Sequence, residues 1–121
     1  MNDDITMLGN VRVFSCRASG RQISTEADIN DLIGTALGER ADLVALPVER
    51  LTQGFLELRT GFAGLLVQKF ANYRLRLAII GDMEGACARS KALKDFVYEA
   101  NRGAACWFLR ELSDLNTRMA Q

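Results

Sequence analysis

Hydrophobic and polar residues alternate near the start of the chain and then recur at helical spacing. The segment VRVFSC, residues 11–16, alternates like a half-buried strand near a sheet edge. After the turn RASG, the segment RQIS at residues 21–24 is expected to form a short strand paired with it. Thr25 and Asp28 have the spacing of a capping box, and the apolar residues that follow predict a helix that ends at Gly38.

Three further strands are expected, each followed by a helix. They are LVALP at residues 43–47, LRLAIIGD at 75–82 and AACWFL at 104–109. The first is a continuous apolar run that ends at the only proline, which is typical of a parallel strand covered on both faces. Between the last two, MEGACAR is expected to be a loop, and Ser90 to be the N-cap of a helix that Gly103 stops. Leu112, Leu115 and Met119 mark a final amphipathic helix.

The segment LRTGFAGLLVQKFANY, residues 58–73, combines helical periodicity with two glycines. Thr52 is expected to cap the long segment that runs through Tyr73. Gly61 and Gly64 each cost about 1 kcal/mol of helix propensity relative to alanine. That cost indicates either a break near Thr60 or a helix that passes close to the sheet or to a neighbouring helix, and we favour the close approach.

The order of elements predicts the fold class. Strands that alternate with helices are joined by right-handed crossovers and form a mainly parallel sheet. We therefore expect a single α/β domain, residues 1–121, with a mixed sheet, a hairpin at its N-terminus and about four helices. At this length the chain can bury about two-thirds of the surface that its unfolded form would expose.

Composition excludes several classes of function. The chain has 15 basic and 15 acidic residues and a formal net charge of zero, which argues against binding to nucleic acid or to an anionic membrane. It has no histidine, so a Ser-His-Asp or Cys-His catalytic site cannot be built from this chain alone. Cys16, Cys87 and Cys106 lie far apart and are expected to be reduced thiols, with Cys106 in the core. With no apolar run near the ~20 residues of a membrane helix, we expect a cytoplasmic protein.

Candidate site residues lie where the parallel strands end, because ligands collect at the carboxyl ends of such strands. Glu49 follows one strand, Asp82 ends the next, and Ser90 opens a helix whose free N–H groups could hold an anion. Alternatively, Gly81 and Asp82 could simply form the turn that ends the strand. Glu49, Asp82 and Glu84 could converge to hold a magnesium ion if their strands are neighbours. Our expectation is nevertheless no cofactor and no metal.

Arg59 and Thr60 are the second candidate site. The guanidinium of Arg59 could bind a phosphate or a carboxylate through two contacts. The alternative is structural: Arg59 pairs with Glu57 or Glu49, and Thr60 caps a helix that restarts at Gly61.

Two long stretches resemble a known family. ERLTQGFLELRTGFAGLLVQKFANYRLRLAIIGD and SKALKDFVYEANRG are similar to a bacterial family catalogued as domain of unknown function 4180, and the resemblance runs from about Ile23 to Leu109. The family has no established activity, so this resemblance implies an α/β fold and no catalytic residues. The order of elements is also similar to that of STAS domains, the anti-sigma-factor-antagonist type. In those domains a phosphorylatable Ser or Thr opens the helix after the third strand, which implies a regulatory role for Thr52, although the surrounding Asp-Ser-Ser-Gly-like pattern is missing.

Three hypotheses for the function follow. The first is a regulatory or protein-interaction module without catalysis, with a protein partner or as a homo-oligomer. The second is a small-ligand binder or enzyme that uses Arg59, Asp82 and Ser90 at the strand ends. The third, nucleic-acid binding, is the least favoured because the net charge is zero.

Overall fold

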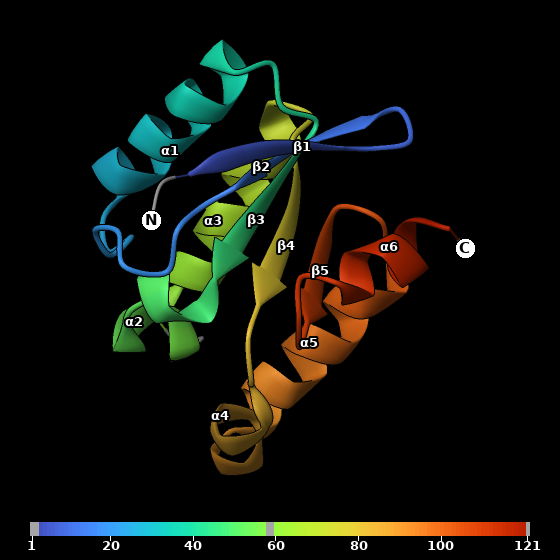
Figure 1. The fold of residues 1–121 in the computed structure, drawn as a ribbon. Helices are drawn as coiled ribbons and strands as arrows, with labels where there is room; N and C mark the ends of the chain where they lie inside the picture. The colour runs from blue at the N-terminus through green and yellow to red at the C-terminus, as the bar shows by residue number, and fades with distance from the viewer. Residues whose placement is uncertain (1–2, 58–59, 121) are drawn as a thin grey trace.

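One five-stranded sheet organises the molecule. The computed structural model describes residues 3–57 and 60–120. The strands lie side by side in chain order: β1 (Asp4–Leu8), β2 (Val11–Ser15), β3 (Leu43–Pro47), β4 (Arg76–Ile80) and β5 (Cys106–Leu109). β1 is antiparallel to β2, and β2 to β5 are parallel. The expected single α/β domain, with a mixed, mainly parallel sheet and an N-terminal hairpin, is confirmed (Figure 1).

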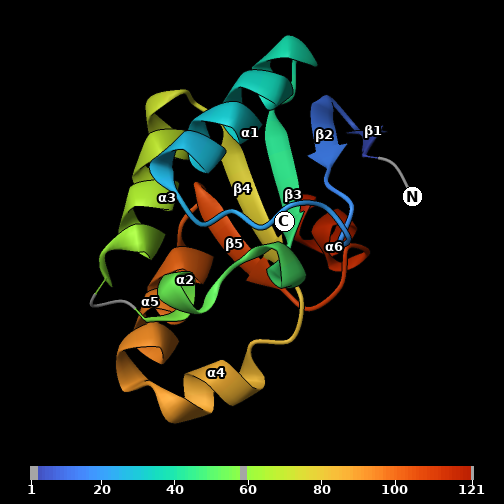
Figure 2. The same cartoon turned by 90° about the vertical axis from the view of Figure 1, so that its left-hand side faces the viewer.

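The helices are distributed unequally over the two faces of this sheet. They are α1 (Glu26–Gly38), the 3-10 helix η1 (Val48–Arg50), α2 (Gln53–Leu56), α3 (Phe62–Asn72), α4 (Glu84–Arg89), α5 (Lys91–Arg102) and α6 (Asp114–Met119). The three long helices α1, α3 and α5 share one face, and α6 lies on the other (Figure 2). The cause is the strand order: right-handed crossovers between strands that always advance in the same direction place every connecting helix on the same side.

The strands bury side chains on both faces, in two apolar clusters of different size. Val44, Leu46, Leu77 and Ile79 are almost fully buried against α1, α3 and α5, in the main core. The opposite side chains form a smaller apolar cluster in which Leu115 of α6 is fully buried: Val13, Leu43, Ala45, Ala78 and Trp107. None of the described helices is long and apolar enough to cross a membrane.

The expected partner strand of the hairpin was wrong. Residues 21–24 form no strand, and Ile23 makes an isolated bridge with Leu51. The hairpin is instead formed by β1 and β2, which pair Leu8 with Val11 around Gly9 and Asn10. Gly9 has a φ of 61°, a conformation that glycine adopts without steric cost and that two-residue hairpin turns need.

Residues 17–21 are held by a side chain rather than by a strand ladder. Nε of Arg50 donates to the carbonyl of Arg21 at 2.5 Å, and its Nη1 donates to the carbonyl of Arg17 at 2.8 Å. The guanidinium lies against Gly20, where a Cβ would come within 2.5 Å of it. The Arg17 N–H donates to the carboxylate of Asp3 at 2.8 Å, so the recorded hydrogen bonds of this segment are made to side chains and not to a neighbouring strand.

The long segment from Thr52 to Tyr73 is broken. α2 ends at Leu56, and α3 begins at Phe62 after Gly61, which has a left-handed φ of 77°. The expected break near Thr60 is confirmed. The close approach that we favoured for the glycines is wrong: Gly64 is exposed, and no atom outside its own helix lies within 4 Å of the place where its Cβ would be.

The helix starts follow the sequence well, with one exception. Thr25 and Asp28 form the expected capping box of α1, and the Ser90 hydroxyl accepts a hydrogen bond from the Leu93 N–H at 3.1 Å at the start of α5. Residues 83–89, which we expected to be a loop, contain α4. Its first turn is prepared by Asp82, whose carboxylate accepts from the Glu84 N–H at 2.9 Å.

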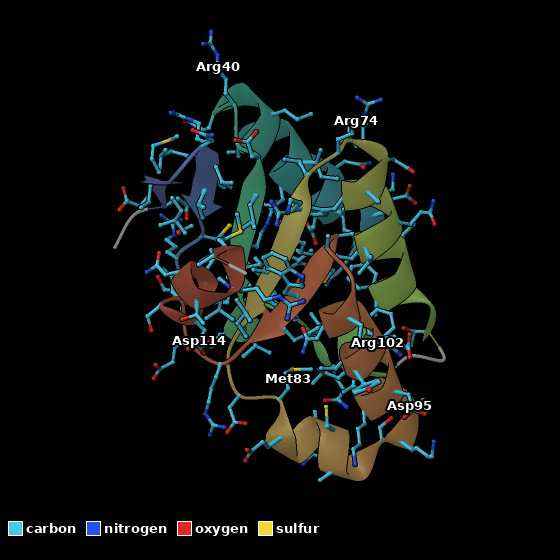
Figure 3. The ribbon with its side chains drawn as sticks, turned by 90° about the vertical axis from the view of Figure 1, so that its right-hand side faces the viewer. Arg40, Arg74, Met83, Asp95, Arg102 and Asp114 are labelled. Carbon is cyan, nitrogen blue, oxygen red and sulfur yellow. The ribbon has the colours of Figure 1, made fainter. Side chains whose placement is uncertain are left out.

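Two arginines end helices in a conformation that usually requires glycine. Arg40 and Arg74, with φ values of 61° and 58°, follow α1 and α3. The next N–H in each case bonds five residues back, Ala41 to Ala36 and Leu75 to Phe70, which is the Schellman pattern. Figure 3 shows both arginine side chains pointing away from the molecule at the end where β3 and β4 begin. These tight stops let each helix turn directly into the following strand.

Candidate functional site

The carboxyl end of the sheet brings three strand termini together. Pro47 of β3 is opposite Ile80 of β4, and Ile80 is opposite Leu109 of β5. The chain then continues into η1, into α4 and into the loop before α6. Glu49 lies exposed on η1, and Asp82 follows β4 directly. The sequence therefore placed these two residues at the correct end of the sheet.

Asp82 is paired with a basic residue that the sequence analysis did not single out. Arg110 lies 3.8 Å from Asp82 and 3.0 Å from Glu84. The hydrogen bond to Glu84, and then the negative charge of both carboxylates, raise the pKa of Arg110. All three side chains are more than half exposed, so water weakens these ion pairs. The arrangement ties the end of β5 to the start of α4.

Magnesium binding at this end receives no support from the carboxylates. Asp82 and Glu84 both face the cationic Arg110. Throughout residues 3–57 and 60–120, no group of three or more acidic or cysteine side chains is placed to hold a metal ion.

Gly81 has a clear packing role next to Asp82. Its φ is 150°, and a Cβ at this position would lie 2.3 Å from Cγ1 of Val48. Such a contact is far inside van der Waals distance, so β4 can reach this position only with glycine. The Gly-Asp pair thus ends the strand. Gly81 lets Val48 of η1 pack against the backbone, and Asp82 bonds to the first turn of α4.

Ser90 lines a hollow on the same side of the molecule but apart from Asp82. This hollow has a volume of about 380 Å³, and its lining is Gln53, Leu56, Glu57, Ala86, Arg89, Ser90 and Ala92. Asp82 lines a second hollow of about 240 Å³ with Met83, Cys87 and Arg110 among its walls. The structure therefore places Asp82 and Ser90 in two separate hollows.

Thr60 has a structural role. Its Oγ1 lies 2.7 Å from the carbonyl oxygen of Gly54 and 2.9 Å from that of Glu57, and it accepts a hydrogen bond from the Phe62 N–H at 3.3 Å. The hydroxyl thus joins the end of α2 to the start of α3. The predicted cap is displaced by one residue, because α3 begins at Phe62 and Gly61 occupies its N-cap position. Arg59 lies outside the described residues. Thr52 occupies the N-cap position of α2 without a capping hydrogen bond from its side chain.

The direction of the strand order explains why these residues do not converge. A ligand crevice in a parallel sheet opens where the strand order reverses, because neighbouring connections then leave on opposite faces. The order β1 to β5 never reverses. All the crossovers leave on one face, and the polar residues at the strand ends are spread over the surface.

A groove on the other face was missed by the sequence analysis. It lies between the β1–β2 hairpin and α6 and has a volume of about 320 Å³. Its lining is Thr6, Leu8, Val13 and Ser15 from the strands, with Leu112, Ser113, Leu115 and Asn116 from α6 and the loop before it. Leu112 is 47 % exposed at this position. The dipeptide Gly9-Asn10 between two apolar runs was the signal that could have identified the hairpin, and with it this wall of the groove.

α6 is anchored to its face of the sheet through an aromatic ring. The guanidinium carbons of Arg76 and Arg118 lie 4.8 Å and 4.6 Å from the ring centroid of Trp107, within the range of cation–π attraction. Arg118 also donates to the main-chain carbonyl of Asn101. These contacts fix the end of α6 over β5 and leave the sheet near the hairpin open as the groove.

The fold and these surfaces define a small α/β domain. Its strands lie side by side in chain order, and α6 covers only part of the second face of the sheet. The chain belongs to the family described as Domain of unknown function (DUF4180), whose model matches residues 8–119. The match extends beyond both ends of the stretch from about Ile23 to Leu109 that resembles this family. No curated protein and no solved structure matches the chain.

Proposed function

We propose that this domain is a protein-interaction module without catalysis, and that it binds a partner protein in the groove between the hairpin and α6. The observation that carries the proposal is the apolar character of this groove on a sheet face that the crossovers leave uncovered. The buried Val13 and Leu115 lie beneath it, and Leu8 and the exposed Leu112 in its lining supply accessible apolar surface. An apolar side chain of a partner would bury this surface and gain about 25 cal/mol for each Å² removed from water.

Charge and thiol chemistry support the same proposal. A net charge of zero favours a protein partner over nucleic acid. Cys16, Cys87 and Cys106 form no disulfide with one another, which suits the reducing cytoplasm where we propose that the domain acts. A regulatory role, by analogy with the STAS-like order of elements, belongs to this proposal, and so does a modification at Thr52.

A charge placed in the groove tests the proposal. The variant Leu112→Asp introduces a carboxylate where we expect an apolar side chain of the partner, and Tyr98→Asp is the matched control. Tyr98 is 62 % exposed on α5 and lies outside the groove. A partner captured by the wild type should be retained by the control and lost by Leu112→Asp.

The affinity of the purified partner then decides the outcome. We expect Leu112→Asp to weaken binding by about tenfold or more, as for a residue that contributes over 1 kcal/mol at an interface. Equal affinity of all three proteins would reject the groove as the binding surface. Thermal unfolding of each variant shows that the fold is intact.

A second candidate function is the binding of a small anion such as phosphate. It is favoured by the hollow of about 380 Å³, where Arg89 and Ser90 lie at the start of α5. If it is correct, phosphate should raise the melting temperature of the wild type and not that of Arg89→Gln. The control is Arg102→Gln at the opposite end of α5, where Arg102 pairs with Glu99 at 3.7 Å. No shift in the wild type at any phosphate concentration would exclude this candidate.

A further inference from the structure

At each edge of the sheet a side chain holds one outward backbone N–H, and the two edges differ in what surrounds them. At β5, the side chain of Asn101 accepts a hydrogen bond from the Phe108 N–H at 2.7 Å. A donor that could pair with another strand is thereby occupied. β1 forms the opposite border of the sheet (Figure 2), and within the described part of the chain no helix covers its outer side.

The hairpin register shows which groups of β1 point outward. In an antiparallel pair, alternate residues exchange both backbone hydrogen bonds with the partner strand. Leu8 and Val11 flank the two-residue turn and form such a pair, so Thr6 and Asp4 also bond to β2. The N–H and carbonyl groups of Ile5 and Met7 therefore point away from β2, toward the outer edge of the sheet. The Met7 side chain is 53 % exposed, and the Ile5 N–H is held by the carboxylate of Asp4 at 3.1 Å.

We propose that a second copy of this chain pairs with this edge, β1 against β1 in antiparallel orientation, around a two-fold axis at Thr6. In this register Ile5 of one copy is opposite Met7 of the other. The Met7 N–H bonds to the Ile5 carbonyl, and the Ile5 N–H leaves the Asp4 carboxylate to bond to the Met7 carbonyl of the other copy. Their side chains meet on the face of the main core, where Ile5 already packs. The sheet then continues from one copy into the other and covers Met7.

The sequence of β1 is complementary to itself in this register. The apolar Ile5 and Met7 meet twice, once on each side of the axis, and Thr6 meets Thr6. Asp4 is opposite Leu8, so the Asp4 residues of the two copies lie about 14 Å apart along the strand and repel each other little. An identical strand therefore satisfies the outward peptide groups without placing like charges in contact, which is why we assign a second copy as the occupant.

This pairing goes beyond the proposed function and does not depend on it. The groove uses side chains on one face of the sheet, whereas the dimer uses the outward backbone of β1. Leu112→Asp should leave the dimer intact, and variants at Met7 should leave the groove lining unchanged. Failure of either proposal is therefore visible separately.

A proline at Met7 tests the hydrogen bonds of the edge. Met7→Pro removes an N–H that points outward and leaves the ladder between β1 and β2 complete, a position that edge strands tolerate. The control Met7→Val keeps this N–H and an apolar side chain. By sedimentation equilibrium we expect a dimer for the wild type and for Met7→Val, and a dissociation constant at least about tenfold higher for Met7→Pro. A monomeric wild type at all concentrations, or an unchanged dimer of Met7→Pro, would overturn the proposal.

A cysteine on the axis tests the register. Residues directly opposite in a pair without hydrogen bonds have Cα atoms about 4.5 Å apart, which a disulfide can span. In a Cys87→Ser background, Thr6→Cys should give a covalent dimer with mild oxidant, and Asp4→Cys should not. Equal cross-linking of both variants, or of neither, would reject an axis at Thr6. Circular dichroism of each variant establishes that the domain is folded.

Discussion

The side chain of Asn101, in the last turn of α5, accepts a hydrogen bond at 2.7 Å from the backbone N–H of Phe108 in β5. The carbonyl of the same residue accepts from Arg118 of α6. One residue thus connects the helix that precedes β5, the outer edge of β5 and the helix that follows it. Asn101 lies in the segment YEANRG, which resembles the family. Its role is to connect α5 to β5 and to α6.

We predict that Asn101→Ala lowers the free energy of unfolding by about 1–3 kcal/mol, because the Phe108 N–H loses its partner in a partly buried place. Asn101→Asp keeps an acceptor oxygen at this position and should lose less. Urea unfolding of the three proteins measures the difference. Equal stability of Asn101→Ala and the wild type would show that water replaces the side chain without cost.

The two glycines that bear most on the sequence interpretation should respond in opposite directions to alanine. Gly81→Ala forces a Cβ against Val48 and should cost about 1–3 kcal/mol of stability. Gly64→Ala places a methyl group in open space on α3 and should stabilise the domain by up to about 1 kcal/mol through helix propensity. Thermal unfolding of both variants tests this, and destabilisation by Gly64→Ala would restore the idea of a close helix contact.

Local signals explain what the sequence could predict of the fold. The capping box of Thr25 and Asp28 and the cap at Ser90 are satisfied within a few residues, so their spacing alone identified α1 and α5. β3 was recognisable because both of its faces are apolar and buried. β1 gave no such signal, since an edge strand with Met7 exposed buries too little to alternate clearly. α4, with six residues, is too short to show a helical period.

The candidate site could be predicted less well because its partners come from distant parts of the chain. Glu84 and Arg110 are 26 residues apart and meet through the neighbouring strands β4 and β5. No spacing along the sequence encodes that contact. The groove likewise combines residue 6 with residue 116, and only the absence of a reversal in strand order leaves its face open.

The start of α1 should make stability depend on pH. The carboxylate of Asp28 accepts hydrogen bonds from the N–H groups of Ser24 and Thr25, at 3.0 Å and 3.1 Å. The bond from Ser24 is the largest cause that lowers the pKa of Asp28. Because the folded-state pKa is below the unfolded value of about 3.9, this stabilisation is complete above that value and is lost as the pH falls through the folded-state pKa.

The variant Asp28→Asn isolates this effect. Its free energy of unfolding should lie below that of the wild type at neutral pH, and the difference should shrink as the pH falls below about 4. Asp31→Asn is the control, since Asp31 makes an exposed ion pair with Arg21 and takes no part in the capping box. A gap between wild type and Asp28→Asn that stays constant down to pH 2 would contradict the assignment.

The three cysteines should react with a thiol reagent in a fixed order. Burial raises the pKa of Cys16 and of Cys106 to about 12, and a carboxylate at Asp3 adds to the effect at Cys16. At pH 8 a thiol with such a pKa is ionised in about one molecule in 10⁴, and the thiolate is the reactive form. Cys87 is half-buried, and although burial also raises its pKa, the nearby Lys94 opposes the shift. We therefore expect Cys87 to react first in the folded protein.

The Cys87→Ser variant should lose the fast phase of labelling, and denaturant should expose the remaining two thiols together. Mass spectrometry of the labelled peptides identifies each site. Cys106 lies in β5, where Asn101 bonds to the Phe108 N–H. Cys16 lies far from this contact, directly after β2. Asn101→Ala should therefore accelerate the labelling of Cys106 more than that of Cys16. Equal acceleration of both would indicate that the variant loosens the whole domain, whereas selective acceleration would locate the effect at the edge of β5.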